Sequence, residues 1–280
     1  MRAWLLIEVN GAWGRDAVAD SRLGPHARRP WREAMKARGV RVITIRRDLD
    51  DHHAHPSPGL RLVHVAAARP GQPVVASRRV IEDLHHVVPV TESLVGTGAT
   101  DDDWVADTDR YVLVCTNGRH DACCATQGRP LVRHLRNTAW TDEVWECSHI
   151  GGDRFAGNLL LLPDSLYFGR CGAADAERLL AAHDEGRLDL ASLRGRSTLT
   201  LVEQAAEQFV RTELDLDHLD AVTEVTTTAP GHVHVELGDG RAVDVVVTRS
   251  LAPSSSPLTC NGREGLSYPV FALADLTVTR

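Results

Sequence analysis

The sequence predicts an α/β protein in which the element order β-α-β-β-β-α occurs twice, followed by a helix and a small antiparallel β extension. Short runs rich in valine, isoleucine and leucine alternate with longer amphipathic stretches, and the same order of runs returns in the second part of the chain. Towards the end, apolar and polar residues alternate, which is typical of half-buried strands. With 280 residues, of which 43% are hydrophobic, the chain can bury more than one core.

The first copy of the pattern occupies residues 1–95 and contains no candidate ligand. We therefore expect a degenerate unit that packs against the second copy. Its predicted elements are a buried strand at 3–9, a helix at 25–39 that ends at Gly39, a strand at 40–47, a strand pair at 60–67 and 73–80, and a helical end at 81–87.

The second copy occupies residues 109–196, after an acidic segment at 96–108 that is predicted to be a linker. Its predicted elements are a strand at 111–115, a helix at 125–137, strands at 142–147, 158–163 and 166–170, and a helix at 173–185.

From residue 197 to 280 the pattern changes to one helix and several short alternating runs. The predicted elements are an amphipathic helix at 198–214 and strands within 222–228, 232–248 and 268–279. An Asp-Gly pair at 239–240 favours a hairpin turn. The Pro/Ser-rich stretch at 252–259 is predicted to be an exposed loop that leads to Cys260.

Four side chains that bind metals lie in two short segments, each of which follows a predicted strand. Cys115 and Cys124 lie in YVLVCTNGRHDACCATQG, and His149 and Asp153 lie in ECSHIGGDRFAGN. If the fold places the two strands side by side, all four side chains reach one end of a sheet. Thiolate, imidazole and carboxylate groups bind iron or zinc, and the Gly-Gly pair between His149 and Asp153 allows the backbone to bend closely around a bound group. The sequence therefore predicts a metal or cluster site.

The other cysteines and one histidine supply alternatives for these positions. Five of the six cysteines lie between 115 and 171, which favours a thiol site over scattered core cysteines. Reserve ligands are Cys123, Cys147 and His120. Asp153 has a second interpretation, as an acceptor that orients His149 or as a turn residue. Cys115 and Cys124 also have a second interpretation, as buried apolar side chains that bind no metal.

The segment from Tyr111 to Cys171 resembles the thioredoxin-like [2Fe-2S] ferredoxins and, more closely, the sucrase/ferredoxin-like family, which includes a yeast actin-patch-associated protein. The resemblance is carried by VLVC, CATQG, HIGGD and NLLLLPDSLYFG. It implies tandem thioredoxin-like units and a [2Fe-2S] cluster on Cys115, Cys124, His149 and Asp153. In such ferredoxins the last two ligands are cysteines, and in fungal relatives they are histidines. Asp153 departs from both patterns, because a carboxylate is a harder ligand for iron.

A cluster with these ligands supplies one-electron chemistry, so the sequence predicts an electron carrier rather than an enzyme. No phosphate loop, nucleotide fingerprint or Ser-His-Asp pattern is present. No carboxylate pair is placed for sugar hydrolysis, which excludes a hydrolase. The alternative is a structural zinc site on the same four residues, in a binding or scaffold protein.

Composition limits the partners and the compartment. A net charge of −7 argues against a nucleic-acid partner, and no apolar run approaches the roughly 18 residues that a membrane-spanning helix needs. We expect a cytoplasmic protein, monomeric or homodimeric, whose redox donor and acceptor are other proteins. A reducing compartment also fits six cysteines better as ligands or buried groups than as a disulfide framework.

Overall fold

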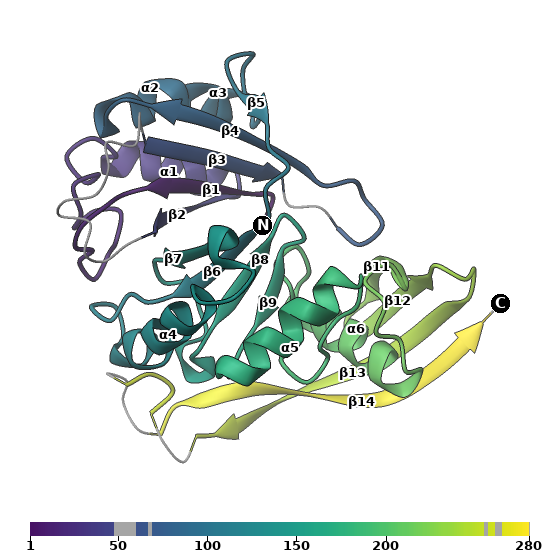
Figure 1. Ribbon diagram of the computed structural model, residues 1–280. Coiled ribbons are helices and arrows are strands. Elements are labelled where there is room, and N and C mark those ends of the chain that lie inside the picture. The colour runs from purple at the N-terminus through teal and green to yellow at the C-terminus, as the bar shows by residue number, and fades with distance from the viewer. Residues whose placement is uncertain (48–59, 67–68, 255–256, 261–264, 280) are drawn as a thin grey trace.

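The computed structural model describes residues 1–47, 60–66, 69–254, 257–260 and 265–279. Within these residues, one mixed sheet has ten strands and a second, antiparallel sheet has four (Figure 1). The α/β class and the C-terminal antiparallel sheet are therefore confirmed. The strand orders are β10-β9-β8-β6-β7-β2-β1-β3-β4-β5 in the large sheet and β11-β12-β13-β14 in the small one.

Within the described residues, the first half of the large sheet contains five strands, of which the first three bury most of their apolar residues. Its elements are β1 (Ala3–Glu8), α1 (Arg29–Ala37), β2 (Val40–Arg46), β3 (Leu60–Ala66), β4 (Val75–Ile81), η1 (Leu84–His86), α2 (Val87–Val90), α3 (Glu92–Gly96) and β5 (Val105–Ala106). The predicted helical end at 81–87 starts later and continues as α2 and α3. β5 lies inside the predicted linker and pairs with β4.

The second half carries the two candidate ligand segments. Its elements are β6 (Tyr111–Cys115), α4 (Ala122–Leu135), η2 (Thr141–Glu143), β7 (Val144–Cys147), η3 (Asp153–Phe155), β8 (Leu159–Leu162), β9 (Leu166–Phe168), α5 (Ala173–Asp184) and β10 (Leu193–Arg196). β10, which the sequence did not predict, pairs with β9.

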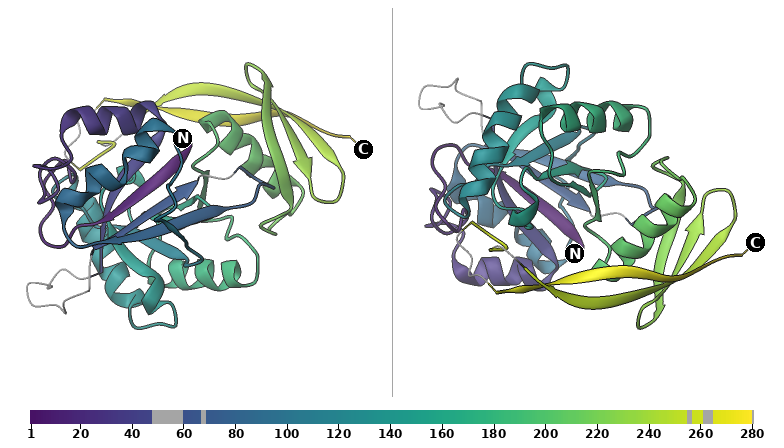
Figure 2. Two further views of the ribbon diagram at one scale, coloured as in Figure 1. Left: turned by 90° about the horizontal axis from the view of Figure 1, so that it is seen from above. Right: turned by 90° about the horizontal axis from the view of Figure 1, so that it is seen from below.

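The C-terminal part consists of one helix packed on the small sheet. Its elements are α6 (Leu201–Glu213), β11 (Val222–Ala229), β12 (His232–Leu237), β13 (Ala242–Pro253) and β14 (Ser267–Thr279). β13 and β14 pair along their whole length and extend well beyond the other two strands, alongside the large sheet (Figure 2). The predicted loop at 252–259 is therefore partly strand, because Ala252 and Pro253 still pair with β14.

The two halves of the large sheet share one strand arrangement. β1 pairs parallel with β2 and antiparallel with β3, and β6 pairs parallel with β7 and antiparallel with β8. The halves are joined through β2 and β7, which pair antiparallel, so they form one continuous sheet.

Helices cover the outer faces of both halves, and the helix-free faces share a core. One core lies under α1 and includes Trp31 and Met35, and another lies under α4 and α5 and includes Leu135 and Leu179. A third core joins residues from both halves. Within it, the ring of Trp4 contacts Tyr167 edge-on, with 6.1 Å between the ring centroids. The sheet therefore folds back so that its inner faces pack on each other.

A buried ion pair lies at the junction of the halves. Arg46 and Glu146 are register partners in β2 and β7, and Arg46 Nη2 donates to Glu146 Oε2 at 3.0 Å, with side chains 4% and 1% exposed. Thr116 Oγ1 also donates to Glu146 Oε2, at 2.6 Å. Removing one member of such a pair leaves an uncompensated buried charge, which is strongly destabilising.

We expect Glu146→Gln to lower the free energy of unfolding by about 3–5 kcal/mol, because Arg46 remains buried without its anion. Glu33→Gln is the matched control, since Glu33 pairs with Arg29 on the surface, where side chains are 61% and 81% exposed. That control should change stability by no more than about 0.5 kcal/mol. Denaturant unfolding measures both. Equal losses in the two variants would show that the junction pair is not a buried contact.

Candidate metal centre

The two ligand segments leave the sheet at the same end. β6 and β7 are parallel neighbours, and Cys115 is the register partner of Cys147. Cys115 is the last residue of β6, and residues 148–153 follow β7. Because the carboxyl ends of parallel neighbours meet at one edge, the chain brings a thiol and a histidine-containing loop together there.

Cys124 reaches this edge from a helix, and not from a loop as the sequence suggested. α4 begins earlier than predicted because the Asp121 side chain caps it, accepting a hydrogen bond from the Cys123 N–H at 3.3 Å. Gly128 lets the helix approach β6, since a Cβ there would lie 2.1 Å from the carbonyl oxygen of Cys115. The first turn of α4 is therefore held beside the end of β6.

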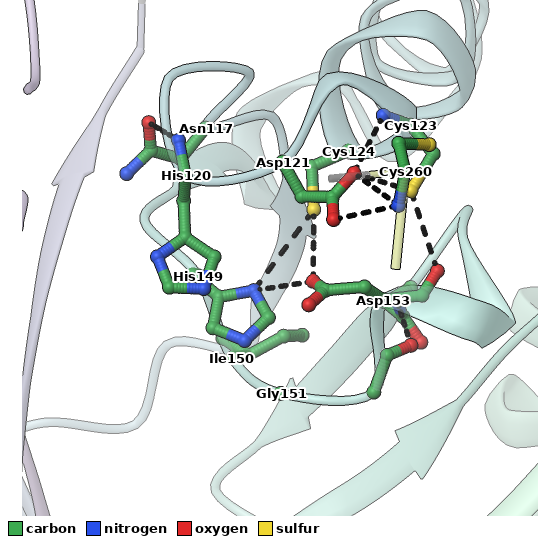
Figure 3. Close-up of polar contacts among 12 residues, drawn as sticks. Asn117, His120, Asp121, Cys123, Cys124, His149, Ile150, Gly151, Asp153 and Cys260 are labelled. Atoms are coloured by element: carbon green, nitrogen blue, oxygen red, sulfur yellow. Dashed lines mark hydrogen bonds and ion pairs between the residues drawn. The ribbon is translucent and has the colours of Figure 1, made fainter. Parts of the chain in front are cut away.

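The four predicted ligands come together, and Figure 3 shows three of them, Cys124, His149 and Asp153. His149 Nδ1 lies 2.9 Å from Asp153 Oδ1, and the Cys124 thiol lies 3.5 Å from that same oxygen and 3.9 Å from His149 Nδ1. The ligand atoms of Cys115, Cys124 and His149 all lie within 4.8 Å of one another. The donor set is thus two sulfurs, one nitrogen and one carboxylate oxygen.

The loop that carries His149 is held by hydrogen bonds to successive carbonyl groups. Arg41 Nη2 donates to the carbonyl of His149 at 3.2 Å, and the Tyr167 hydroxyl donates to the carbonyl of Ile150 at 3.1 Å. Arg41 lies in β2, in the half that contributes no ligand. The first half therefore helps to position the ligand loop.

The next two carbonyl groups of the loop accept hydrogen bonds from side chains in the second half of the large sheet. Arg194 Nη1 donates to the carbonyl of Gly151 at 3.4 Å and to Asn158 Oδ1 at 2.7 Å, while Asn158 Nδ2 donates to the carbonyl of Gly152 at 2.9 Å. Gly152 has φ +78°, and a Cβ there would meet Arg194 at 2.3 Å. Glycine suits this backbone conformation, and a larger residue would force the guanidinium to move.

Electrostatic contacts shift the pKa values of the site residues in opposite directions. The hydrogen bond with Cys124, helped by His149, lowers the pKa of the Cys115 thiol to about 5. Burial lowers the pKa of His149, but Asp153 and Cys115 outweigh burial and raise it to about 9. Burial raises the pKa of Asp153, but the hydrogen bond with His149 brings it below its usual range. The hydrogen bond with Cys115 and burial raise the pKa of Cys124.

These pKa shifts are those expected of a site that binds a cation. The lowered pKa values of Cys115 and Asp153 favour their anionic forms, and the raised pKa values of His149 and Cys124 favour one bound proton on each. A metal that takes all four ligands displaces those two protons.

Two arginines add positive charge behind the ligand loop. Within the described part of the chain, neither Arg41 nor Arg194 forms an ion pair with a carboxylate, and their polar partners are carbonyl, hydroxyl and amide oxygens. Burial lowers the pKa of Arg194. Since the ligand set is anionic, these guanidinium groups favour negative charge at the site.

The thiols are buried, whereas the imidazole side is accessible. Cys115 and Cys124 are each 1% exposed, and the His149 side chain is 19% exposed. His120 stacks on His149, with 3.9 Å between the ring centroids. Both histidines line an open cavity of about 460 Å³, to which Arg15 and Asn117 also contribute.

The reserve ligands take different places. His120 lies close enough to His149 and Asp153 to share a metal with them. Cys147 is buried in the core at the end of β7 and belongs to none of the potential ligand groups among the described residues. The Cys123 thiol points towards Asp121 and Cys260, and it lies 3.6 Å from the backbone carbonyl oxygen of Asp153. Of these alternatives, only His120 shares a potential ligand group with predicted ligands among the described residues.

Sequence reasoning missed the groups that support the centre. Asp121 had a recognisable signal, because an aspartate just before a helix is a common N-cap. Arg41, Tyr167, Arg194 and Asn158 had none, since each acts on backbone carbonyls that lie far away in the sequence or across the loop.

Comparison with known proteins agrees with the family resemblance. Residues 1–195 match the family described as Sucrase/ferredoxin-like. The chain is similar to "Altered inheritance of mitochondria protein 32" of Candida glabrata, with 29% identity over 106 residues, covering 32% of this chain and 34% of that protein. The chain thus spans about a third of the length of this relative. No solved structure matches.

We expect Asn158→Ala to loosen the ligand loop, because the carbonyl of Gly152 loses its donor and Arg194 loses an acceptor. The free energy of unfolding should fall by about 1–3 kcal/mol, the penalty for buried polar groups left unsatisfied. Amide exchange across 149–153 should accelerate, as hydrogen exchange with mass spectrometry can measure. Asn137→Ala is the control, since exposed Asn137 donates to the carbonyl of Arg133 at 2.7 Å. Unchanged exchange in the loop would contradict this support.

Proposed function

The chain belongs to the sucrase/ferredoxin-like family, and we propose that it is an electron carrier with a [2Fe-2S] cluster on Cys115, Cys124, His149 and Asp153. The observation that carries the proposal is the convergence of two thiols, an imidazole and a carboxylate at the end of β6 and β7. A bound cluster would supply one-electron chemistry.

The donor set fits a cluster with mixed ligands. Cys115 is poised as a thiolate, and thiolates are the usual protein ligands of iron–sulfur centres. His149 turns Nδ1 towards Cys124 and Asp153, which leaves Nε2 free to hold a proton. An imidazole in place of a thiolate makes the ligand set less negative and raises the reduction potential, whereas a carboxylate at Asp153 lowers it again. A proton on the free nitrogen would couple electron and proton movement.

The surroundings suit electron transfer at a protected centre. Buried thiols and the core of the sheet exclude water from one side, while His149 and the stacked His120 offer a short route to the surface. Arg41 and Arg194 stabilise the extra negative charge of a reduced state. We infer that a redox donor and an acceptor protein approach at the histidine side, with no role for nucleic acid.

The fold supports a finer interpretation of the two halves. We interpret 1–95 and 109–196 as tandem thioredoxin-like units, with 96–108 as a linker and 197–280 as an extension. The support is that strand pairing is parallel and antiparallel at the same places in both halves. The second half alone supplies the ligands, and the first supplies Arg41.

The described helices include none long and apolar enough to cross a membrane. All six cysteines are free thiols. Because thiols persist in a reducing compartment, we propose a cytoplasmic location for the carrier, as a monomer or homodimer.

A structural zinc site is the second candidate. The distances of 2.9, 3.5 and 3.9 Å among the ligand atoms also suit a single ion, and two thiolates with an imidazole and a carboxylate are a zinc donor set. Metal analysis separates the two. About two irons and two sulfides per chain with visible colour support the cluster, whereas one zinc per chain in a colourless protein supports the structural zinc site.

Cys124→Ser is expected to remove the visible absorption and the iron, because the hydroxyl is a poor replacement for a thiolate ligand. Cys171→Ser is the matched control, since Cys171 is also buried, at 4% exposure, but lies in the core under α4 and α5. Iron content and visible spectra are the measurements. A colourless Cys123→Ser together with a coloured Cys124→Ser would move the ligand by one residue.

Asp153 is tested by two substitutions. If its carboxylate binds iron, Asp153→Ala should lose most of its iron, and Asp153→His should keep a cluster with a higher and more pH-dependent reduction potential, because a neutral ionisable ligand replaces an anion. If Asp153 only orients His149, Asp153→Ala should keep its cluster with affinity lower by about 10–100-fold. Protein-film voltammetry and iron analysis measure these outcomes. An alanine variant identical to the wild type would transfer the fourth position to His120.

A further inference from the structure

The β13–β14 hairpin brings Cys260, which lies between its two strands, to the start of α4. Its two strands run along the large sheet (Figures 1 and 2). The Cys260 N–H lies 3.2 Å from Oδ1 and 2.9 Å from Oδ2 of Asp121, a residue 139 positions earlier (Figure 3). Asp121 thus caps α4 and anchors the hairpin tip with the same carboxylate.

Two thiols converge on that carboxylate. The Sγ atoms of Cys123 and Cys260 and a carboxylate oxygen of Asp121 all lie within 4.8 Å of one another, and the Cys123 thiol donates to Asp121 Oδ1 at 3.0 Å. Both thiols are free. None of these three residues belongs to the donor set of the candidate cluster centre. The tip and the helix therefore form a second, separate group of potential ligands.

We propose that Cys123, Cys260 and Asp121 form a second metal site, for a thiophilic divalent cation of the zinc type. The two soft thiolates favour such an ion over magnesium or calcium, which prefer oxygen donors, and zinc also accepts the carboxylate. Three protein ligands leave the fourth position of a tetrahedral site to water. The backbone N–H groups that already hold Asp121 fix its orientation, as the supporting hydrogen bonds of metal ligands do.

The position of the thiols is not explained by capping or by packing alone. An N-cap needs only the carboxylate of Asp121, and anchoring the tip needs only the Cys260 N–H. Cys260 is solvent-exposed, so its thiol is not there to fill a core. Cys123 and Cys260 also line an open cavity of about 490 Å³, which gives a cation a path to the site.

A bound ion would cross-link the hairpin to the helix. The link joins residues more than a hundred positions apart, so it would restrict the chain as a long-range cross-link does. It would also hold the tip beside the candidate cluster centre, because the Cys123 thiol lies 3.6 Å from the carbonyl oxygen of Asp153. An ion in the second site would therefore hold Cys260 close to the Asp153 side of the candidate cluster centre, without using any ligand of that centre.

The test is metal binding by the intact chain, purified anaerobically and freed of loosely held metal with a mild chelator. Titration with Co²⁺ should give tetrahedral cobalt–thiolate absorption, and Zn²⁺ should displace it with one ion per chain. Cys260→Ala should weaken binding at least about 100-fold, the upper end of the losses found when only a supporting partner is removed. Cys123→Ala should behave alike, and Cys171→Ala should bind as the wild type does.

Two results would overturn the second site. One is full Co²⁺ and Zn²⁺ affinity in Cys260→Ala, whose substitution lies on the exposed tip and leaves the cores intact. The other is a Cys123–Cys260 disulfide, found by mass spectrometry in the anaerobic protein. Iron and sulfide are measured in the same samples. A chain without iron that still binds zinc through Cys260 would reject the electron carrier and keep this site, and an iron-loaded chain that binds no zinc would do the reverse.

Discussion

Parallel pairing of β6 with β7 places Cys115 and the loop after Cys147 at one end of the sheet, and the candidate centre follows from that placement. The loop is then held at four successive carbonyls, from His149 to Gly152, by side chains from several strands and loops. Backbone groups bonded in this way fix the direction of the imidazole before any metal arrives. Such preorganisation matters because a ligand loop left free would lose conformational entropy on binding.

The half without ligands takes part in the site because the sheet is continuous. The β2–β7 pairing and the buried Arg46–Glu146 ion pair align β2 with the ligand strands, and Arg41 on β2 then reaches the carbonyl of His149. With Arg194 it adds cationic charge behind an anionic donor set. A separate first unit could keep its own core, but it could not supply this charge.

The adjacent cysteines at the start of α4 point in two different directions, towards two different groups of potential ligands. Successive residues on a helix point about 100° apart, since there are 3.6 residues per turn. Cys124 therefore faces the core and Cys115, while Cys123 faces the hairpin tip and Cys260. Asp121 fixes both directions by capping the helix. One short turn thus connects the candidate cluster centre with the proposed cation site.

The sequence predicted most of the elements and the kinds of ligand, because apolar periodicity, caps and residue types are local properties. It identified the strands around both ligand segments and the four residues that the fold brings together, although it placed Cys124 in a loop and started α4 too late. How these elements meet depends on tertiary packing. The β2–β7 junction, the arginine at position 41 that holds the ligand loop, and the approach of Cys260 to Asp121 each join segments about a hundred or more residues apart. Such contacts depend on the packing of the whole chain, which no local pattern records.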